Sequence, residues 1–329
     1  MEDGTKQTAE KYCNPITFAV KHNNAVRMSS RSGGFFTAVS DYVLNKDGVV
    51  YGCVLDEKFH AIHIRAKTVT DRDRMRGSKY IQSQMGDIFE SVKRDLQTGD
   101  EVLFTGTSCQ VAGLKSFLRE EYANLLTVDI VCHGVPSPLV WDKYLEWQQR
   151  KLQNTICEVA FRNKKDYGWK AHVESLYLNN GTQIDSKVFT TLFYGHSILR
   201  PCCYHCPYKD IMHPGNITIA DYWGIDKAAP GFNDDKGVSL VLINDDIGER
   251  YFNLVKDELQ IKETSLKDSL QPPLIAPFPE PANREQFWKY FSEKPFDKVA
   301  RKYGGMGVAN KIKKKIRTII KHIKRIFKT

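Results

Sequence analysis

The sequence predicts an α/β fold in which a mixed, largely parallel sheet is flanked by helices. Up to about residue 150, short apolar segments rich in Val, Ile and Leu alternate with amphipathic segments, which is the pattern of parallel strands connected by helices. Residues 155–184 are rich in strand-forming residues and contain an Asn-Asn-Gly turn, which indicates an antiparallel excursion. A strand over 236–245 and a helix over 247–259 then follow.

The first predicted elements lie before residue 70. Residues 16–30 alternate in polarity, which predicts a short hairpin with two asparagines in its turn. Residues 32–48 begin with Ser-Gly-Gly, continue with helical apolar spacing and end at a glycine, so a helix is predicted there. Residues 49–57 and 60–69 are predicted strands.

The next elements build the parallel part of the expected sheet. An amphipathic helix over 85–100 precedes the apolar strand 101–106, and a second helix over 111–122 precedes the strand 125–134. Residues 137–152 begin as a helix should, with a serine cap and a proline in the first turn.

Composition divides the chain into a body and flanking segments. A hydrophobic content of 41% is that of a globular protein, whereas five prolines over 271–282 are typical of an ordered strap or linker. The predicted organisation is an N-terminal extension at 1–14, the N-terminal part of the body at 15–95, the C-terminal part of the body with a cysteine cluster at 96–270, a Pro-rich strap and linker at 271–310, and a basic amphipathic helix at 311–329.

The net charge of +9 belongs to residues 311–329, because this segment holds nine Lys or Arg and no acidic residue. Its Ile and Phe residues recur at helical spacing, which places an apolar face opposite a cationic one. Such a helix is typical of binding to an anionic membrane surface. A helix that binds a partner protein and a nucleic-acid tail are the alternatives. We expect the membrane surface, since the apolar face would not contact a phosphate backbone.

The rest of the chain is formally neutral, so no nucleic-acid partner is expected. The first residues include acids and lack the apolar core of a secretory signal. No stretch reaches the roughly 18 apolar residues of a membrane-spanning helix. We therefore expect a cytoplasmic protein, peripheral on the inner face of the cell membrane, whose cysteines are thiols or metal ligands.

Four cysteines occupy positions typical of a metal site. Cys109 follows a predicted strand in a Gly-containing loop, and Cys132 ends the next strand, so parallel strands would bring both thiols to one edge of the sheet. Cys203 and Cys206 form a Cys-x-x-Cys pair, which can direct two sulfurs at one ion. Four thiolates suit zinc or an iron–sulfur cluster, and the ligand types do not separate the two. Because the four cysteines are spread through a large α/β body, we favour an iron–sulfur cluster over a zinc ion.

The other cysteines are assigned to packing or to the surroundings of this site. Burial in the core is the ordinary alternative for a single cysteine, and nothing around Cys13, Cys53 or Cys157 favours ligation. Cys202 is adjacent to Cys203, and adjacent side chains diverge, so we expect Cys202 beside the site and not as a fifth ligand.

Three loops are candidates for binding an anion. The loop from Arg31 to Phe36 places glycine amides at a helix start, where the helix dipole favours phosphate. The loop from Gly77 to Ser83 presents Lys79 between small hydroxyl residues. The Gly-Thr-Ser-Cys-Gln loop adds further amides. The ordinary alternatives are a simple helix cap for the glycines and a solvated lysine.

Taken in order, these segments resemble the family formed by the beta subunits of coenzyme F420 hydrogenases and dehydrogenases. The resemblance extends from about residue 15 to residue 260. It implies an iron–sulfur flavoprotein oxidoreductase that exchanges electrons between a deazaflavin (coenzyme F420) or another reducible substrate, FAD and a 4Fe-4S cluster. The matching segments are SSRSGGFFTAVSDYVL, GSKYIQS, FTGTSCQVAGLKSFL, VDIVCHGVPSPLVWDKYL, FRNKKDYGW, LRPCCYHCPYK and ITIADYWGI.

The resemblance also implies roles for single residues. Lys79, an implied flavin contact, is a candidate catalytic residue that would favour the anionic reduced flavin. Its position next to Cys132, and not the resemblance, makes His133 a candidate hydrogen-bond donor or proton carrier. Packing is the alternative for His133. The implied cluster ligands are Cys109, Cys132, Cys203 and Cys206. The implied flavin contacts are Ser32, Gly33, Gly34, Lys79, Gly106, Thr107 and Gln110.

The sequence departs from the family pattern at its beginning. Longer relatives carry an N-terminal ferredoxin module with repeated cysteines, whereas this chain has only Cys13 there. We therefore expect a ferredoxin or another electron-transfer protein as a separate partner. Two other functions remain as alternatives: a non-catalytic metal-binding scaffold recruited to the membrane, and a nucleotide-sugar-dependent transferase of cell-envelope polysaccharide synthesis.

Overall fold

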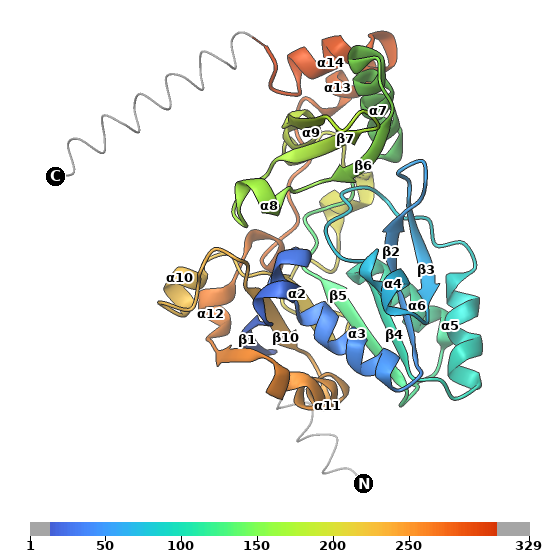
Figure 1. The fold of residues 1–329 in the computed structure, drawn as a ribbon, viewed down its shortest axis with the longest axis vertical. Coiled ribbons are helices and arrows are strands. Elements are labelled where there is room, and N and C mark those ends of the chain that lie inside the picture. Colours follow the sequence, from blue (N-terminus) through green and yellow to red (C-terminus); the bar gives the residue numbers. More distant parts are fainter. Residues whose placement is uncertain (1–13, 308–329) are drawn as a thin grey trace, which may run out of the picture. The chain divides into compact units, whose positions relative to one another are not determined.

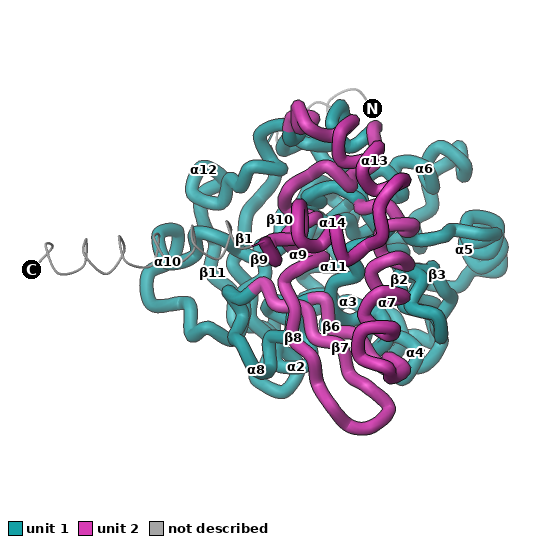
Figure 2. The backbone as a smooth tube through the Cα atoms, turned by 90° about the horizontal axis from the view of Figure 1, so that it is seen from above, with its two compact units in different colours: residues 1–135, 162–171, 202–278 teal, residues 136–161, 172–201, 279–329 magenta. Residues whose placement is uncertain are grey.

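The computed structural model describes residues 14–307, which form two compact units (Figures 1 and 2). Unit 1 runs to Val135 and adds Arg162–Ala171 and Cys202–Phe278. Unit 2 comprises Pro136–Phe161, His172–Pro201 and the described residues from Pro279. The chain therefore passes between the units several times.

Unit 1 is built on an eight-stranded sheet of order β11-β1-β10-β9-β5-β4-β2-β3. The pairs β2–β4, β4–β5 and β5–β9 are parallel, and the other pairs are antiparallel. This confirms the predicted mixed sheet, with its parallel strands in the middle. The strands are β1 (Ile16–Lys21), β2 (Val49–Leu55), β3 (Ala61–Ala66), β4 (Val102–Thr107), β5 (Leu125–Ile130), β9 (Ile217–Asp221), β10 (Ser239–Ile243) and β11 (Gln260–Glu263).

Helices cover both faces of this sheet (Figure 1). On one face, Phe35 and Val39 of α3 pack with Phe252 of α11 against the apolar side chains of the strands. On the other face, α5 and α6 pack against Val102 and Phe104 of β4. The larger helices of unit 1 are α3 (Phe35–Asn45), α5 (Ile88–Gln97), α6 (Ser108–Leu118) and α11 (Asp246–Val255). The shorter ones are α2 (Asn24–Ser29), α4 (Val69–Asp73), α8 (Lys164–Tyr167), α10 (Ile225–Ala228) and α12 (Leu266–Ser269).

The hairpin predicted for residues 16–30 is wrong in its second half. β1 forms as expected, but the chain then enters α2. The side chain of Asn23 accepts a hydrogen bond from the Val26 amide at 3.0 Å and so caps that helix. Asparagine favours both tight turns and helix N-caps, and here the cap is formed.

Unit 2 contains a three-stranded antiparallel sheet of order β6-β7-β8, which confirms the predicted excursion. Buried Glu174 holds this sheet to α9, because its carboxylate accepts hydrogen bonds from the amides of Phe189 and Thr190 at 2.8 Å. The negative charge at a helix N-terminus is favourable. The elements of unit 2 are α7 (Pro138–Leu152), β6 (Ile156–Ala160), β7 (Glu174–Leu178), β8 (Gln183–Ser186), α9 (Val188–Tyr194), α13 (Arg284–Glu293) and α14 (Phe296–Lys302).

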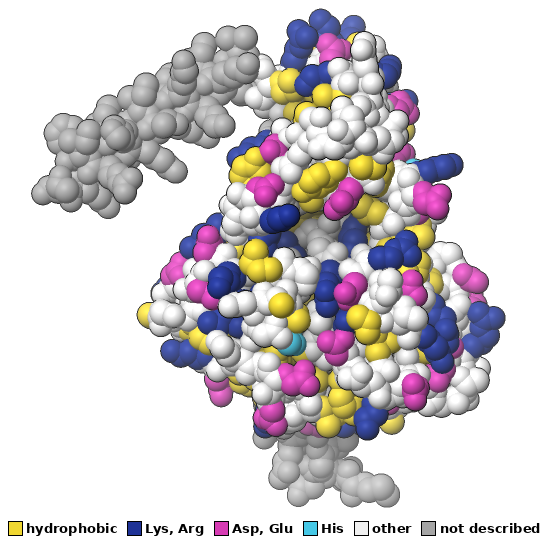
Figure 3. All heavy atoms as spheres, viewed as in Figure 1, with side chains coloured by type: hydrophobic (Ala, Val, Ile, Leu, Met, Phe, Trp, Pro, Cys, Tyr) yellow, Lys and Arg dark blue, Asp and Glu magenta, His cyan; other side chains and the backbone are white. Residues whose placement is uncertain are grey.

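Cationic and anionic side chains are interspersed on the face drawn in Figure 3, in keeping with a formally neutral body. Within residues 14–307, no helix has the length and apolar character needed to cross a bilayer. The predicted basic helix at 311–329 and Cys13 lie outside the described residues.

Candidate functional site

Cys109 and Cys132 lie at the same edge of the sheet of unit 1. β4 and β5 are parallel neighbours, with Thr107 opposite Ile130 at their carboxyl ends. Cys109 follows β4 in the first turn of α6, and Cys132 follows β5 by two residues. The predicted parallel arrangement of these strands is therefore confirmed, and with it the common edge.

The Cys-x-x-Cys pair lies near Cys109 and Cys132. Cys203 lies in the 3-10 helix Pro201–His205, and Cys206 follows it. Burial raises the pKa of the Cys132 thiol to about 12, and the nearby thiols of Cys203 and Cys109 contribute to this increase. Burial likewise raises the pKa of Cys206, with a contribution from Cys109. The four sulfurs are therefore close enough to interact electrostatically.

Backbone amides donate hydrogen bonds to three of these sulfurs. The Val135 amide reaches the Cys203 sulfur at 3.4 Å. Each such bond favours the thiolate form of its cysteine, and amide–sulfur bonds tune iron–sulfur clusters. The donors Gly134, Val135 and Tyr208 serve the sulfurs of Cys132, Cys203 and Cys206, respectively.

Lys209 supplies a buried positive charge beside the thiols. Its side chain donates to the carbonyl of His133 at 2.7 Å and lies 4.7 Å from the ring centre of Phe278. Burial lowers its pKa, whereas Cys132 and Cys206 act to raise it. A cation in this position compensates the charge of a thiolate set. Lys209 directly follows the LRPCCYHCPY sequence, but sequence reasoning gave it no role.

The imidazole of His133 packs against Phe278, with 4.3 Å between the ring centres. This contact agrees with the packing alternative. The catalytic role of His133 stays a prediction.

The four cysteines do not form a preassembled site for a single ion. Within the described part of the chain, no three Cys, His, Asp or Glu side chains converge on a point that could hold one metal ion. Ligation of a cluster by Cys109, Cys132, Cys203 and Cys206 stays a prediction.

A hydrogen-bond network joins two of the predicted loops. Gln110 Nε2 donates to Ser83 Oγ at 2.7 Å, and Ser83 Oγ lies 2.9 Å from Nδ1 of His63. Nε2 of His63 is 3.0 Å from the carbonyl oxygen of Thr105. Burial lowers the pKa of His63 to about 4. Sequence reasoning missed His63, which is one inward-facing residue of a predicted strand and carries no local signal.

Lys79 is held by the backbone of its own loop. Its Nζ donates to the carbonyls of Arg74, Met75 and Arg76 at 2.7–3.0 Å, which uses all three protons of the ammonium group. Burial lowers its pKa to about 8, while Cys53 acts to raise it. In this arrangement Lys79 stabilises the turn after α4, and its contact with a flavin stays a prediction.

The Ser-Gly-Gly loop is tied to β10. Ser32 Oγ donates to the carbonyl of Val238 at 2.7 Å, and the Gly33 amide donates to Ser239 Oγ at 3.0 Å. Gly34 begins α3 with a left-handed φ of 91° and no side-chain cap. The first amides of α3 therefore have no capping side chain.

Two of the segments that resemble the family, FRNKKDYGW and ITIADYWGI, contain no predicted site residue. They meet at Asp221. Arg162 donates to its carboxylate at 2.9 Å, Arg31 at 3.3 Å, and the indole of Trp169 at 2.9 Å. Burial lowers the pKa of Arg31, while Asp221 and, more weakly, Tyr80 act to raise it. Tyr80 therefore lies near Arg31, so the Ser-Gly-Gly loop and the Lys79 loop are neighbours.

A second buried pair lies under α6. Nδ1 of His213 is 3.0 Å from the carboxylate of Asp129 and 3.1 Å from the Ser108 hydroxyl. Ser108 is the residue before Cys109, so this contact connects the start of α6 to β5. Sequence reasoning missed this pair.

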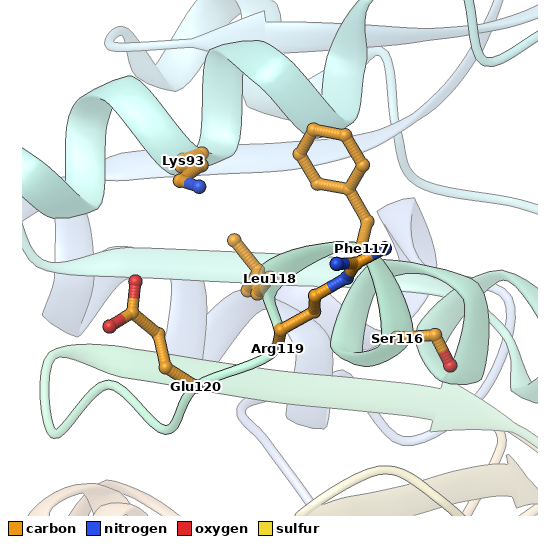
Figure 4. Close-up of a pocket in the computed structure, with 6 residues that line it drawn as sticks. All are labelled: Lys93, Ser116, Phe117, Leu118, Arg119 and Glu120. Atoms are coloured by element: carbon orange, nitrogen blue, oxygen red, sulfur yellow. The ribbon is translucent and has the colours of Figure 1, made fainter.

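The pocket shown in Figure 4 lies at the other end of α6, away from Cys109. It has a volume of about 520 Å³ and is open to solvent. It is separate from the residues described above. Its lining is Lys93, Ser116, Phe117, Leu118, Arg119 and Glu120.

Comparisons with known proteins identify a family and a fold. The family model for the C terminus of the coenzyme F420 hydrogenase/dehydrogenase beta subunit matches residues 99–269, more than half of the chain. The chain is 21% identical over 240 residues to the F subunit of the F420H2 dehydrogenase of Methanosarcina mazei. That alignment covers 71% of this chain and 61% of the relative.

A solved structure shares the fold. It is a chain of the xenon-derivatised F420-reducing NiFe hydrogenase complex of Methanosarcina barkeri, with a TM-score of 0.54 and 18% sequence identity. The match covers 77% of this chain and 84% of the other.

Proposed function

The chain belongs to the family of coenzyme F420 hydrogenase/dehydrogenase beta subunits, and from this premise we propose that it is an iron–sulfur flavoprotein oxidoreductase. Its cofactors would be FAD and a 4Fe-4S cluster, and its substrate a deazaflavin (coenzyme F420) or another reducible compound. The observation that carries the proposal is the neighbourhood formed by two strand-end cysteines and a distant Cys-x-x-Cys pair.

The cluster would be held by Cys109, Cys132, Cys203 and Cys206. Amide hydrogen bonds to the sulfurs support ligation, because they stabilise the thiolate form before any metal is bound. Lys209 offsets part of the negative charge of such a site. When bound, the cluster supplies one-electron transfer and FAD supplies both one- and two-electron chemistry.

The flavin site would lie where the three predicted loops approach one another. The start of α3 offers amides without a capping side chain, which suits the diphosphate of FAD. An electrostatic interaction between Arg31 and Tyr80 and a hydrogen bond between Ser83 and Gln110 support one common site. Its proposed contacts are Ser32, Gly33, Gly34, Lys79, Gly106, Thr107 and Gln110.

Two interactions complete the proposal. A separate ferredoxin or other electron-transfer protein would exchange single electrons with the cluster. Residues 311–329 would bind the anionic inner face of the cell membrane, where each Lys or Arg contributes about 1 kcal/mol.

Reduced coenzyme F420 tests the substrate directly. Added anaerobically to the cofactor-loaded protein, it should bleach the flavin absorption, and a viologen dye should then be reduced catalytically. A loaded protein whose absorption does not change with reduced F420 but changes with dithionite would contradict the deazaflavin as substrate while keeping the cofactors. A transferase would instead bind nucleotide sugars and lack these redox cofactors.

A further inference from the structure

Hydrogen-bond directions can be assigned along the network that ends at Cys109. Nε2 of His63 faces the carbonyl oxygen of Thr105, which can only accept, so Nε2 carries a proton. His63 is neutral near pH 7, and its Nδ1 must therefore accept from the Ser83 hydroxyl. Ser83 Oγ in turn accepts from Gln110 Nε2. This fixes the orientation of the Gln110 amide, with its oxygen directed at Thr107.

The hydroxyl group of Thr107 has one proton and two possible hydrogen-bond acceptors. Its Oγ1 lies 3.1 Å from Gln110 Oε1 and 3.1 Å from the sulfur of Cys109. Gln110 Oε1 also accepts the Thr107 amide at 2.9 Å, as in a capping box. The Gln110 oxygen is therefore satisfied without the hydroxyl. A Cys109 thiol can donate its own proton to Thr107 Oγ1, but a metal-bound sulfur has no proton and can only accept.

We propose that Thr107 is a positioning residue whose hydroxyl donates to the Cys109 sulfur when that sulfur is a cluster ligand. The inference rests on the proposed function. Cys109 is the one cysteine of the four for which no backbone amide donor is identified among the described residues, and Thr107 supplies the missing bond.

The hydrogen-bond network of Thr107, Gln110, Ser83 and His63 then has a role at the cluster ligand Cys109. Through Thr107, Gln110 and Ser83, Cys109 is connected to the loop that carries Lys79. The side chain of Gln110 accepts a hydrogen bond from the Thr107 amide and donates to Ser83 and to the sulfur of Met85. Gln110 then orients Thr107 through the backbone amide of that residue.

Thr107→Val tests the proposal, because valine has the same shape and lacks the hydroxyl. The midpoint potential of the cluster is measured by an anaerobic redox titration followed by electron paramagnetic resonance. A hydrogen bond to a ligand sulfur stabilises the more negative reduced cluster. We expect Thr107→Val to lower the reduction equilibrium constant about tenfold, which is about 59 mV for a one-electron couple.

Two variants serve as controls. Thr107→Ser keeps the hydroxyl and should titrate close to the wild type. Thr105→Val removes a hydroxyl from the same strand, but this one donates to the carbonyl of Tyr51 at 3.0 Å. The cluster of Thr105→Val should therefore keep the wild-type potential.

Each outcome is decisive. A Thr107→Val cluster with the wild-type potential would overturn the inference and leave the proposed function intact. If Thr107→Val loses its iron, full iron content in Thr107→Ser supports the hydroxyl contact, and loss from both overturns it. A wild-type protein without iron and sulfide would contradict the proposed function, and the inference with it.

Discussion

The Val135 amide donates a hydrogen bond of 3.4 Å to the sulfur of Cys203, 68 residues away in the chain. It joins the loop after β5 to the Cys-x-x-Cys segment. The bond forms only when unit 1 is folded, so folding itself assembles the candidate cluster site. The same loop carries Cys132, and Lys209 donates a hydrogen bond to the His133 carbonyl of this loop.

Replacement of Cys203 tests this assembly. Cys203→Ser removes the sulfur that accepts the Val135 amide, and the purified protein should lose most of its iron and acid-labile sulfide. Cys202→Ser is the matched control, because Cys202 is adjacent and exposed and is placed outside the ligand set. Equal iron contents in the two variants would contradict the assignment.

Asp221 is expected to be a major source of stability in unit 1. Asp221→Asn leaves two buried guanidinium groups without their carboxylate, so the free energy of unfolding should fall by about 3 kcal/mol. Urea unfolding followed by fluorescence measures this change. Asp226→Asn is the control, since Asp226 forms an exposed ion pair with Lys170, and it should unfold at the wild-type urea concentration. A similar midpoint for both variants would refute the role of Asp221.

Burial of His63 predicts a pH-dependent stability. Its pKa in the folded protein is about 4, below the ordinary value of 6.5, so the unfolded chain binds the proton first as the pH falls. Stability should be constant above pH 6.5 and decrease between pH 6.5 and 4, by about 3 kcal/mol in total from this group.

His63→Gln isolates the contribution of this residue. Glutamine can still contact Ser83 and the Thr105 carbonyl but does not titrate. The difference between the urea midpoints at pH 7 and pH 5 should be smaller in this variant than in the wild type. An unchanged difference would show that other groups cause the pH dependence.

Gly33 is expected to be required for packing. A Cβ atom at this position would lie 2.1 Å from the Val20 oxygen and 2.4 Å from the Ser239 nitrogen, and both are backbone atoms. Gly33→Ala should therefore cost about 2 kcal/mol or more. Gly113→Ala in α6 meets only the Phe89 ring at 3.5 Å and should gain up to about 1 kcal/mol. Thermal unfolding distinguishes the two, and equal melting temperatures would contradict the packing role.

Deletion of residues 311–329 tests the membrane proposal. The full chain should sediment with vesicles that contain anionic lipid, less so at high salt, and not with neutral vesicles. The shortened chain should remain in the supernatant with both. Equal sedimentation of the two chains with anionic vesicles would exclude the tail as the membrane anchor.

Most strands and helices between residues 32 and 152 could be predicted because each carries its own apolar period, whereas β9 and β11 of the same sheet were not predicted. Cys109 and Cys132 could be placed at one edge because each follows such a strand. The predicted hairpin was wrong because asparagine favours both a tight turn and a helix N-cap, and only the tertiary structure decides that Asn23 forms the cap.

The polar partners of the site could not be predicted, because they are distant in sequence. Arg162 and Asp221 are 59 residues apart, and His213 and Asp129 are 84 apart. Lys209 is a surface residue by type, and its burial against Phe278 is a consequence of tertiary packing. Such contacts leave no local pattern in the sequence.

The most direct test of the account is the cofactor content of the wild-type protein purified without oxygen. An ultraviolet–visible spectrum, together with iron, acid-labile sulfide and flavin determinations, measures it. We expect about four iron and four sulfide per chain, one FAD, and a yellow-brown protein. A colourless protein without iron or flavin, or one that binds zinc alone, would contradict it.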